Sequence, residues 1–309
     1  MSLSASAVIP TYSFERWDDL VAALDALERQ TVAPDEVIVV VDGNPELFAR
    51  VRAQFPDVRS LENAQGAGVS GCRNTAAEVA TGSVLACLDD DSVPEPRWLE
   101  EHLAAYEDPA VLGTGGTLIP AWSGGRPGLL PRELWWIIGC TWTGTPETPA
   151  PIRNPVGANM TVRKDVVEAV GGFAMGRVYR DGKPASGVAE ETEFCIRAVE
   201  SHPGGYFQHR PGAVVHHAVP AARTTWSYLV SRSRIEGAGK ATLVRRFGSS
   251  LALASERDYV RRVLPRAIAR ELWSGLRGNP ADFERAAAIL LSVTVTGWAY
   301  ARGRLSPSS

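Results

Sequence analysis

Residues 83–94 read SVLACLDDDSVP, an apolar run that ends in three consecutive carboxylates, Asp89, Asp90 and Asp91. Carboxylates this close repel one another and raise each other's pKa unless something positive lies among them. A divalent cation that carries a phosphorylated ligand is the natural partner, because hard cations bind carboxylate and phosphate oxygens. In open α/β sheets, ligands bind at the carboxyl ends of the strands. The stretch therefore predicts a buried strand of an α/β sheet and metal-assisted handling of a nucleotide or diphosphate.

Strand and helix patterns alternate before this run. Short apolar or β-branched runs predict strands, and apolar residues at helical spacing predict helices between them. The βαβα order predicts an α/β fold with a mostly parallel sheet covered by helices. The expected strands are residues 7–9, 36–41, 58–61 and 83–88, and the expected helices begin at Trp17, Pro45 and the glycine-rich loop 66–71. Later in the chain, helices are expected around Val166, over residues 188–199 and from Thr224 onward.

Composition is typical of a soluble globular protein, with 309 residues, 45% hydrophobic and 22% charged. This length allows one large domain or two small ones. The four cysteines lack metal-type spacing, so reduced thiols in a cytoplasmic setting are expected. The first seven residues carry no basic region, so no signal peptide is expected. Only three lysines accompany a high content of arginine and alanine, which favours a GC-rich bacterial source.

Charge is distributed unevenly along the chain. From Arg223 to the end there are 15 Lys and Arg against 6 Asp and Glu, whereas the preceding residues carry 17 against 29. The last quarter is thus a basic extension of an acidic body. Such an extension often meets phosphate, on nucleic acid, an anionic membrane surface or a diphosphate, although a solvated helical surface explains it equally well.

One run near the end, Ala286–Ala301, has no charged residue. It is shorter than the roughly 20 apolar residues that a spanning helix needs, and it contains several polar side chains. We therefore expect a packed or surface-lying helix there. The expected location is cytoplasmic, with a peripheral contact on the inner face of the cell membrane as the alternative.

Four segments together resemble family 2 glycosyltransferases: VIPTY at 8–12, EVIVVVD at 36–42, the aspartate triplet, and EETEFCIR at 190–197. The resemblance covers roughly residues 5–220. It implies a GT-A fold, which is a nucleotide-diphospho-sugar transferase fold of Rossmann-like type, and inverting transfer of a hexosyl group from a nucleotide-sugar. On this basis residues 1–222 form the catalytic domain and residues 223–309 a basic helical C-terminal extension.

The resemblance assigns a nucleotide and donor site. Asp42 would accept a hydrogen bond from the base, most commonly uracil, so a UDP-sugar is the expected donor. Arg73 would reach the phosphates, because its planar fork binds oxyanions bidentately. A turn aspartate beside Gly43 and a helix-surface arginine are the plainer alternatives. The expected nucleotide- and donor-binding residues are Pro10, Thr11, Tyr12, Asp42, Arg73, Asp89 and Asp90.

Asp89 and Asp91 form the Asp-x-Asp element of the family. Asp91 is expected to ligate Mn²⁺ or Mg²⁺, which would neutralise charge on the leaving nucleoside diphosphate. Some members place a further ligand after the catalytic base, as far along as His216 and His217 lie here. Either histidine could ligate the metal through a neutral imidazole. A histidine packed in the core is the alternative for each.

Glu191 is the expected catalytic base, which takes the proton of the acceptor hydroxyl as it attacks. The family normally has an aspartate at this place, and Glu190 and Glu193 remain alternatives. Acids here also suit a helix N-terminus. The acceptor is expected to contact Glu190, Trp135 and Trp136, because aromatic rings stack on the apolar faces of sugars. Core packing is the alternative for the two tryptophans.

The acceptor could be a lipid-linked glycan or a small molecule. No Gln-x-x-Arg-Trp segment of processive synthases is present, so one sugar per encounter is expected. A nucleotidyltransferase acting on a sugar phosphate, or a non-catalytic carbohydrate-binding protein on the same fold, are the rival functions. The first lacks support because no basic glycine-rich loop follows the first strand. Nucleic acid is not an expected partner, since the body is acidic and lacks interleaved basic and aromatic motifs.

Overall fold

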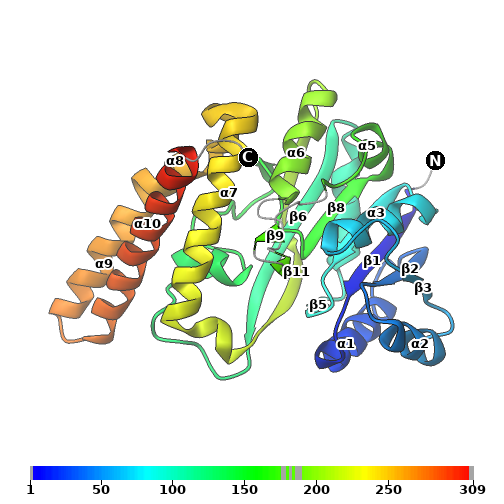
Figure 1. Ribbon diagram of the computed structural model, residues 1–309, viewed down its shortest axis with the longest axis horizontal. Coiled ribbons are helices and arrows are strands. Elements are labelled where there is room, and N and C mark those ends of the chain that lie inside the picture. The colour runs from blue at the N-terminus through cyan, green and yellow to red at the C-terminus, as the bar shows by residue number, and fades with distance from the viewer. Residues whose placement is uncertain (1–2, 175–178, 181–182, 185–189, 306–309) are drawn as a thin grey trace. The chain divides into compact units, whose positions relative to one another are not determined.

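The computed structural model describes residues 3–174, 179–180, 183–184 and 190–305. The chain forms two compact units (Figure 1). The first comprises Met1–Ile119 and Pro146–His217, and the second comprises Pro120–Thr145 and Ala218–Ser309. The segment 120–145 therefore clusters with the C-terminal helices. The domain boundary expected between residues 222 and 223 stays a prediction.

The first unit contains a sheet with helices on both faces. Its strands are β1 (Ala5–Thr11), β2 (Glu36–Val41), β3 (Arg59–Glu62), β4 (Val84–Leu88), β5 (Ser92–Pro94), β6 (Val111–Trp122), β7 (Ala150–Ile152), β8 (Asn159–Arg163) and β11 (Tyr206–Val219). Its helices are η1 (Phe14–Arg16), α1 (Trp17–Glu28), α2 (Pro45–Gln54), α3 (Val69–Val79), α4 (Trp98–Leu103), η2 (Ala104–Glu107), α5 (Lys164–Ala169) and α6 (Glu190–Ser201). The short strands β9 (Tyr179–Arg180) and β10 (Lys183–Pro184) pair with each other. Residues 188–189 of the helix expected at 188–199 lie outside the described residues.

The strand order is β3-β2-β1-β4-β8-β6-β11-β5, with β7 paired to β11. The pairs β3–β2, β2–β1 and β1–β4 are parallel, as the βαβα pattern predicted. Beyond β4 the sheet continues with antiparallel pairs, β4–β8, β8–β6, β11–β5 and β11–β7. Only the first four strands follow one another in strand–helix–strand units, which is the connection that makes neighbouring strands parallel. The parallel part thus holds the first four strands and the antiparallel part lies beside β4.

Two hydrophobic cores cover the two faces of this sheet. Successive residues of a strand point to opposite faces, so Val8 packs in one core and Ala7 and Ile9 in the other. The first core gathers apolar residues from α3, α5 and α6 (Figure 1). The second gathers them from α1, α2 and α4. Strand β4 is buried along its whole length, which confirms the prediction for this apolar run.

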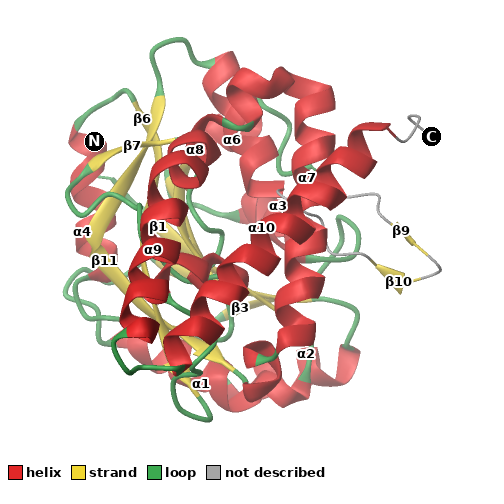
Figure 2. Cartoon of the chain, turned by 90° about the vertical axis from the view of Figure 1, so that its left-hand side faces the viewer, coloured by secondary structure: helices red, strands yellow, loops and turns green. Residues whose placement is uncertain are grey.

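The second unit is largely helical, as predicted for the chain from Thr224 onward. Its helices are η3 (Arg132–Ile138), η4 (Ala221–Thr224), α7 (Trp226–Ala252), α8 (Ala254–Asp258), η5 (Tyr259–Val263), α9 (Leu264–Leu276) and α10 (Ala281–Leu305). Helix α10 packs against both α7 and α9 (Figure 2). The approach of α7 to α10 is close at Gly237, where an added Cβ would lie 2.2 Å from the Thr296 carbonyl oxygen. None of the helices described is long and apolar enough to cross a lipid bilayer.

Candidate active site

The three aspartates occupy the turn between β4 and β5, at the carboxyl end of the parallel strands. Asp90 and Asp91 are almost fully buried. Arg16, from η1, places Nη1 2.5 Å from Asp90 Oδ1 and 2.9 Å from Asp91 Oδ2. Burial raises the pKa of Asp90 to about 6, and Arg16 and the Thr11 hydroxyl oppose that rise. Within the protein, Arg16 therefore supplies the positive charge beside Asp90 and Asp91.

Arg16 was not among the residues that the sequence singled out. It lies 73 positions or more before the carboxylates, and nothing in the local sequence connects the two segments. Parallel pairing of β1 with β4 is what brings the segment after β1 beside the segment after β4. The sequence feature that could have indicated Arg16 is the presence of a basic residue a few positions after the first strand.

The two histidines separate onto opposite faces of β11. In its antiparallel pairing with β5, His217 lies opposite Ser92 and His216 opposite Val93. His217 is buried, with Nδ1 3.1 Å from Asp91 Oδ1 and 3.3 Å from Ser92 Oγ. His216 is exposed, with Nε2 3.0 Å from Glu95 Oε1. Both were expected at a strand end, but β11 continues to Val219.

Arg73 connects the base expected on α6 to the aspartate turn. It lies in the first turns of α3 and is 2% exposed, which is not the position of a helix-surface side chain. Its Nη1 is 3.2 Å from Glu191 Oε1, and its Nη2 is 3.6 Å from Asp89 Oδ1. Its guanidinium also lies 5.6 Å from the Phe173 ring centre. One buried cation therefore holds Glu191 and Asp89 together.

The other acids of α6 have different partners. Glu193 pairs with Arg197 through two contacts of 2.8 Å, so its carboxylate is engaged within the helix. Glu190 accepts a hydrogen bond from the Ser70 hydroxyl, and burial raises its pKa. Of the three acids considered for the base, only Glu191 contacts Arg73 directly in the described contacts.

Gly157 leaves room for the Arg73–Glu191 pair. A Cβ at this position would lie 2.2 Å from Glu191 Oε1 and 2.5 Å from Arg73 Nη2. No side chain larger than hydrogen fits without moving the ion pair. Gly157 was not among the residues that the sequence singled out.

Asn159 is a buried polar centre behind the same turn. Its Oδ1 accepts hydrogen bonds from Trp98 Nε1 and His102 Nε2, each at 2.8 Å. Its Nδ2 donates to the carbonyl oxygens of Thr117, at 3.0 Å, and Ala213, at 2.9 Å. A fully bonded buried amide of this kind fixes the relative positions of the strands that carry the site.

Asp42 ties the end of β2 to the glycine-rich loop. Its Oδ2 accepts from the Gly68 amide and its Oδ1 from Asn63 Nδ2, both at 2.7 Å. Gly68 has φ +102°, a conformation that suits glycine. Pro10 and Thr11 end the neighbouring strand β1, and the following Tyr12 is 56% exposed. The residues expected to contact a nucleotide therefore share one edge of the sheet.

The tryptophans of η3 belong to the second unit. Trp136 Nε1 donates to the Tyr259 hydroxyl at 3.1 Å. Trp135 Nε1 donates to the Leu130 carbonyl oxygen at 3.3 Å, and its ring lies edge-on to Trp122 at 6.1 Å. Both are half-buried. Their packing accounts for part of each indole, and their contact with an acceptor stays a prediction.

The family model described as Glycosyl transferase family 2 matches residues 6–171, more than half of the chain. The chain belongs to glycosyl transferase family 2. The family predicted from the four segments is thereby confirmed, and so is the expectation of a glycosyltransferase enzyme. The match includes β1, β2, the aspartate turn and the Gly157 segment, and it ends before α6.

Curated relatives carry related names. A glucosyl-dolichyl phosphate glucuronosyltransferase of Haloferax volcanii is 31% identical to this family 2 member, over 99% of this chain and 98% of its own. A validoxylamine A glucosyltransferase of Streptomyces hygroscopicus subsp. limoneus is 33% identical over 34% of this chain and 24% of its own.

Two solved structures share the fold. The mannosyltransferase PcManGT of Pyrobaculum calidifontis, solved with GDP-Man and Mn²⁺, has a TM-score of 0.60 at 18% identity and covers 96% of this chain and 88% of its own. GalNAc-T7, solved with UDP, GalNAc and Mn²⁺, has a TM-score of 0.52 at 16% identity and covers 75% of this chain and 47% of its own. These similarities confirm the GT-A fold expected for a family 2 enzyme.

The donor atoms of this family 2 site suit a metal that is shared with a substrate. Among the described residues, no group of three or more His, Cys, Asp or Glu side chains is arranged to hold a metal ion. Asp91 and His217 do meet, at 3.1 Å. Mg²⁺ is commonly bound by one or two carboxylates, with water and substrate phosphates as its other ligands. A pair of protein ligands therefore fits a cation that a diphosphate also binds.

Proposed function

We propose that this chain is a metal-dependent inverting glycosyltransferase. It would move a sugar from a nucleotide-sugar, in particular a UDP-sugar, to a hydroxyl of a glycan carried on a lipid phosphate. The observation that carries the proposal is the Arg73 guanidinium, which contacts both Glu191 and Asp89. It supports a base and a donor-binding carboxylate held on one buried cation at the ligand-binding edge of the sheet.

Glu191 is the proposed general base. Its Oε1 lies against Arg73, which orients the carboxylate, and its side chain is 26% exposed, so an acceptor can reach it. It would take the proton from the acceptor hydroxyl as the oxygen attacks the anomeric carbon. Glu190, held by Ser70 at the start of α6, is proposed to contact the acceptor.

The donor would lie along the ends of β1, β2 and β4. Asp42 and the loop that it holds through Gly68 are proposed to meet the base, and Pro10, Thr11 and Tyr12 to border it. Asp89 and Asp90 would face the ribose and phosphates. Asp91 and His217 would hold Mn²⁺ or Mg²⁺. Such a cation supplies Lewis-acid neutralisation of the charge on the leaving nucleoside diphosphate.

A lipid-linked acceptor is favoured over a small molecule by two observations. The Haloferax volcanii relative, named for a dolichyl phosphate-linked substrate, aligns along nearly the whole of both chains. The second unit also exposes large apolar side chains beside arginines on α9 and α10, as surface-lying helices do. We accordingly propose a peripheral membrane contact through these helices. Trp135 and Trp136 are the proposed aromatic contacts to the acceptor.

Calorimetric titration with UDP, GDP and dTDP, each with and without Mn²⁺, tests the donor site. Asp91→Asn is the test variant, and Asp57→Asn, at an exposed position, is the matched control. Metal-dependent binding of one nucleotide, retained in the control and lost in Asp91→Asn, is the expected result. The absence of nucleotide binding in every condition would contradict the site.

Transfer itself is tested with the nucleotide-sugar of the base so identified and a short-chain lipid phosphate glycan. The anomeric configuration of the product, measured by NMR, is expected to be opposite to that of the donor. Retention of configuration would exclude the single-displacement chemistry proposed for Glu191.

A further inference from the structure

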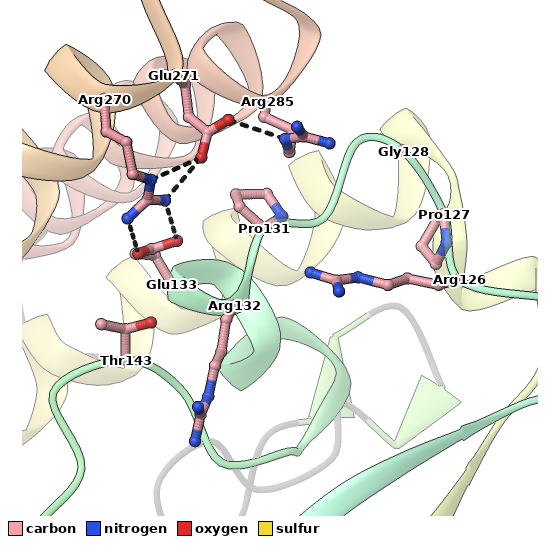
Figure 3. A pocket seen from close by; sticks show the side chains of 10 residues that line it. All are labelled: Arg126, Pro127, Gly128, Pro131, Arg132, Glu133, Thr143, Arg270, Glu271 and Arg285. Carbon is pink, nitrogen blue, oxygen red and sulfur yellow. Dashed lines mark hydrogen bonds and ion pairs between the residues drawn. The ribbon is translucent and has the colours of Figure 1, made fainter. Parts of the chain in front are cut away.

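A pocket of about 590 Å³ lies wholly within the second unit (Figure 3). Four arginines and two glutamates line it: Arg126, Arg132, Arg270, Arg285, Glu133 and Glu271. Pockets that hold ligands of drug size have volumes of roughly 300–1,000 Å³. The space therefore exceeds what a single inorganic ion needs.

Two of the arginines form ion pairs with the glutamates. Arg270 binds both carboxylate oxygens of Glu133, at 3.1 and 3.2 Å, and Glu271 Oε1 at 2.6 Å. Arg285 Nε lies 2.9 Å from the other Glu271 oxygen, and its guanidinium also pairs with Asp282. In Figure 3 the ion pairs among Glu133, Arg270, Glu271 and Arg285 form one continuous chain. The charge of these two guanidiniums is therefore balanced by the carboxylates of Glu133, Glu271 and Asp282.

The other two arginines are not balanced in this way. Arg126 and Arg132 are exposed and make no ion pair with a carboxylate in the described part of the chain. Both guanidiniums instead lie near the ring of Trp135, at 5.5 and 5.9 Å from its centre. Two cations on one indole repel each other, and an anion with several oxygens would relieve that repulsion through charge-assisted hydrogen bonds.

Exposed apolar side chains lie on the helices that carry two of the pocket arginines. Beyond Arg270, helix α9 exposes Leu272, Trp273 and Leu276, the last of which is 74% exposed. Leu276 lies six positions after Arg270, which corresponds to about 9 Å along a helix axis. On α10, Phe283 is exposed two residues before Arg285. The two helices that contribute arginines to the pocket therefore also carry exposed apolar side chains, and Trp273, three residues after Arg270, lies on the neighbouring face of α9.

We propose that this pocket binds the phosphate or diphosphate of the lipid-linked acceptor. Arg126 and Arg132 are the anion ligands, and the Leu272–Leu276 surface of α9 contacts the adjoining part of the lipid chain. The inference rests on the proposed function, whose acceptor class it makes specific. The shared chemistry is a phosphoryl anion, which could also come from free phosphate, and the test separates these sources.

The test measures binding of octyl phosphate and of inorganic phosphate to the full chain by calorimetry. The test variant is Arg126→Gln/Arg132→Gln, because removing Arg270 would leave the buried Glu133 without its partner and endanger folding. The matched control is Arg261→Gln/Arg266→Gln, which removes the same charge from two exposed arginines outside the pocket lining. Leu276→Ser removes an apolar side chain and keeps the arginines, so it distinguishes the contribution of the alkyl chain to binding from that of the phosphate.

Octyl phosphate is expected to bind the unaltered chain and the control with similar affinity, and the test variant at least about tenfold more weakly, since each charge-assisted bond is a strong one. Leu276→Ser is expected to weaken octyl phosphate but not inorganic phosphate. Equal losses of octyl phosphate affinity in the control and the test variant would contradict binding in this pocket. Equal binding of both probes, insensitive to Leu276→Ser, would overturn the lipid-linked source.

The outcome is independent of the donor site. Metal-dependent nucleotide binding depends on Asp91 in the first unit, and the octyl phosphate titration needs neither metal nor nucleotide. The variant Arg126→Gln/Arg132→Gln could retain nucleotide binding and sugar transfer with an unaltered KM for the acceptor. That result would contradict the pocket inference and leave the proposed function standing. Loss of the donor site with intact octyl phosphate binding would sink the proposed function alone.

Discussion

At the scale of single residues, the site is a set of carboxylates held by two buried or half-buried arginines. Arg73 holds Glu191 and Asp89, and Arg16 holds Asp90 and Asp91. Removing either cation would leave carboxylates close together in a poorly solvated place, which costs more than the ion pair itself is worth. The two arginines therefore hold the carboxylates in position before any ligand arrives.

Glu191→Gln should lower kcat for sugar transfer by about 10²–10⁴-fold while leaving the nucleotide Kd nearly unchanged, because the amide cannot accept the proton. Steady-state transfer assays and calorimetry measure the two quantities. Glu200→Gln, an exposed position of the same helix, is the control. A larger loss of kcat in Glu190→Gln than in Glu191→Gln would move the role of base to Glu190.

Arg16→Gln should lower the free energy of unfolding by about 1–3 kcal/mol in the absence of metal, because Asp90 and Asp91 lose their counter-charge. Mn²⁺ should restore more stability to this variant than to the unaltered chain, since the cation replaces the missing charge. Urea unfolding with and without Mn²⁺ measures both effects, with Arg52→Gln, at an exposed position of α2, as control. The same Mn²⁺ response in both chains would argue against a cation at Asp91.

At the scale of elements, short segments set the distances between the strands and helices that carry the site. Gly157 allows the segment before β8 to pass the Arg73–Glu191 pair, and Asn159 joins β8 to α4, β6 and β11. His102, on α4, is part of this buried network. Such contacts position the catalytic edge without touching a substrate.

Gly157→Ala should lower both thermal stability and transfer activity, because its methyl group overlaps Glu191 and Arg73. A destabilisation of about 1–3 kcal/mol is expected for a forced rearrangement in a packed region. Gly297→Ala, in α10, is the contrast: it has no neighbour within 4 Å and should be neutral or stabilising. Thermal unfolding of the two variants tests this prediction. Unchanged stability and activity in Gly157→Ala would show that the ion pair can move to accommodate the methyl group.

Lowering the pH should destabilise the buried hydrogen-bond network that contains His102 of α4. Burial lowers the pKa of His102 from its ordinary 6.5 to about 4, so the unfolded chain binds this proton more readily between those values. Stability contributed by neutral His102 is complete above pH 6.5 and is lost as the pH falls toward 4, by about 1.4 kcal/mol per pH unit. Urea unfolding at pH 7 and pH 5 should show a smaller pH dependence in His102→Gln than in the unaltered chain. Equal pH dependence would exclude His102 as the source.

At the scale of the whole molecule, charge and apolar exposure are distributed along the chain in a way that suits different ligands. The acidic residues lie mostly before Arg223, and the basic excess lies after it. The second unit combines that basic excess with exposed Trp273, Leu276 and Trp298. This combination favours an anionic surface over a neutral one.

Vesicles containing anionic lipid should therefore bind the chain, and neutral vesicles should bind it weakly or not at all. Binding should fall as salt rises, because the basic contribution is screened over roughly 10 Å at 0.1 M salt. Trp273→Ser should reduce it further, since the indole is 57% exposed. Co-sedimentation measures these effects, and equal binding to both vesicle types would contradict the proposed membrane contact.

The sequence by itself determined the order of the first four strands and the helices between them, the family and the fold, because periodicity and the four family segments are local properties of the chain. It also indicated the carboxylates, since three adjacent acids after an apolar run are visible without a structure. Only the tertiary structure decided which groups face them. Arg16, Gly157 and His217 meet their partners through strand pairing and helix packing between distant segments. His216 and His217 point to opposite faces because side chains alternate along a strand, and the register of β11 on β5 decides which of them faces Ser92. The arginine pocket arises because residues 126–132 cluster with α9 and α10. Contacts of this kind depend on long-range pairing, which no local pattern encodes.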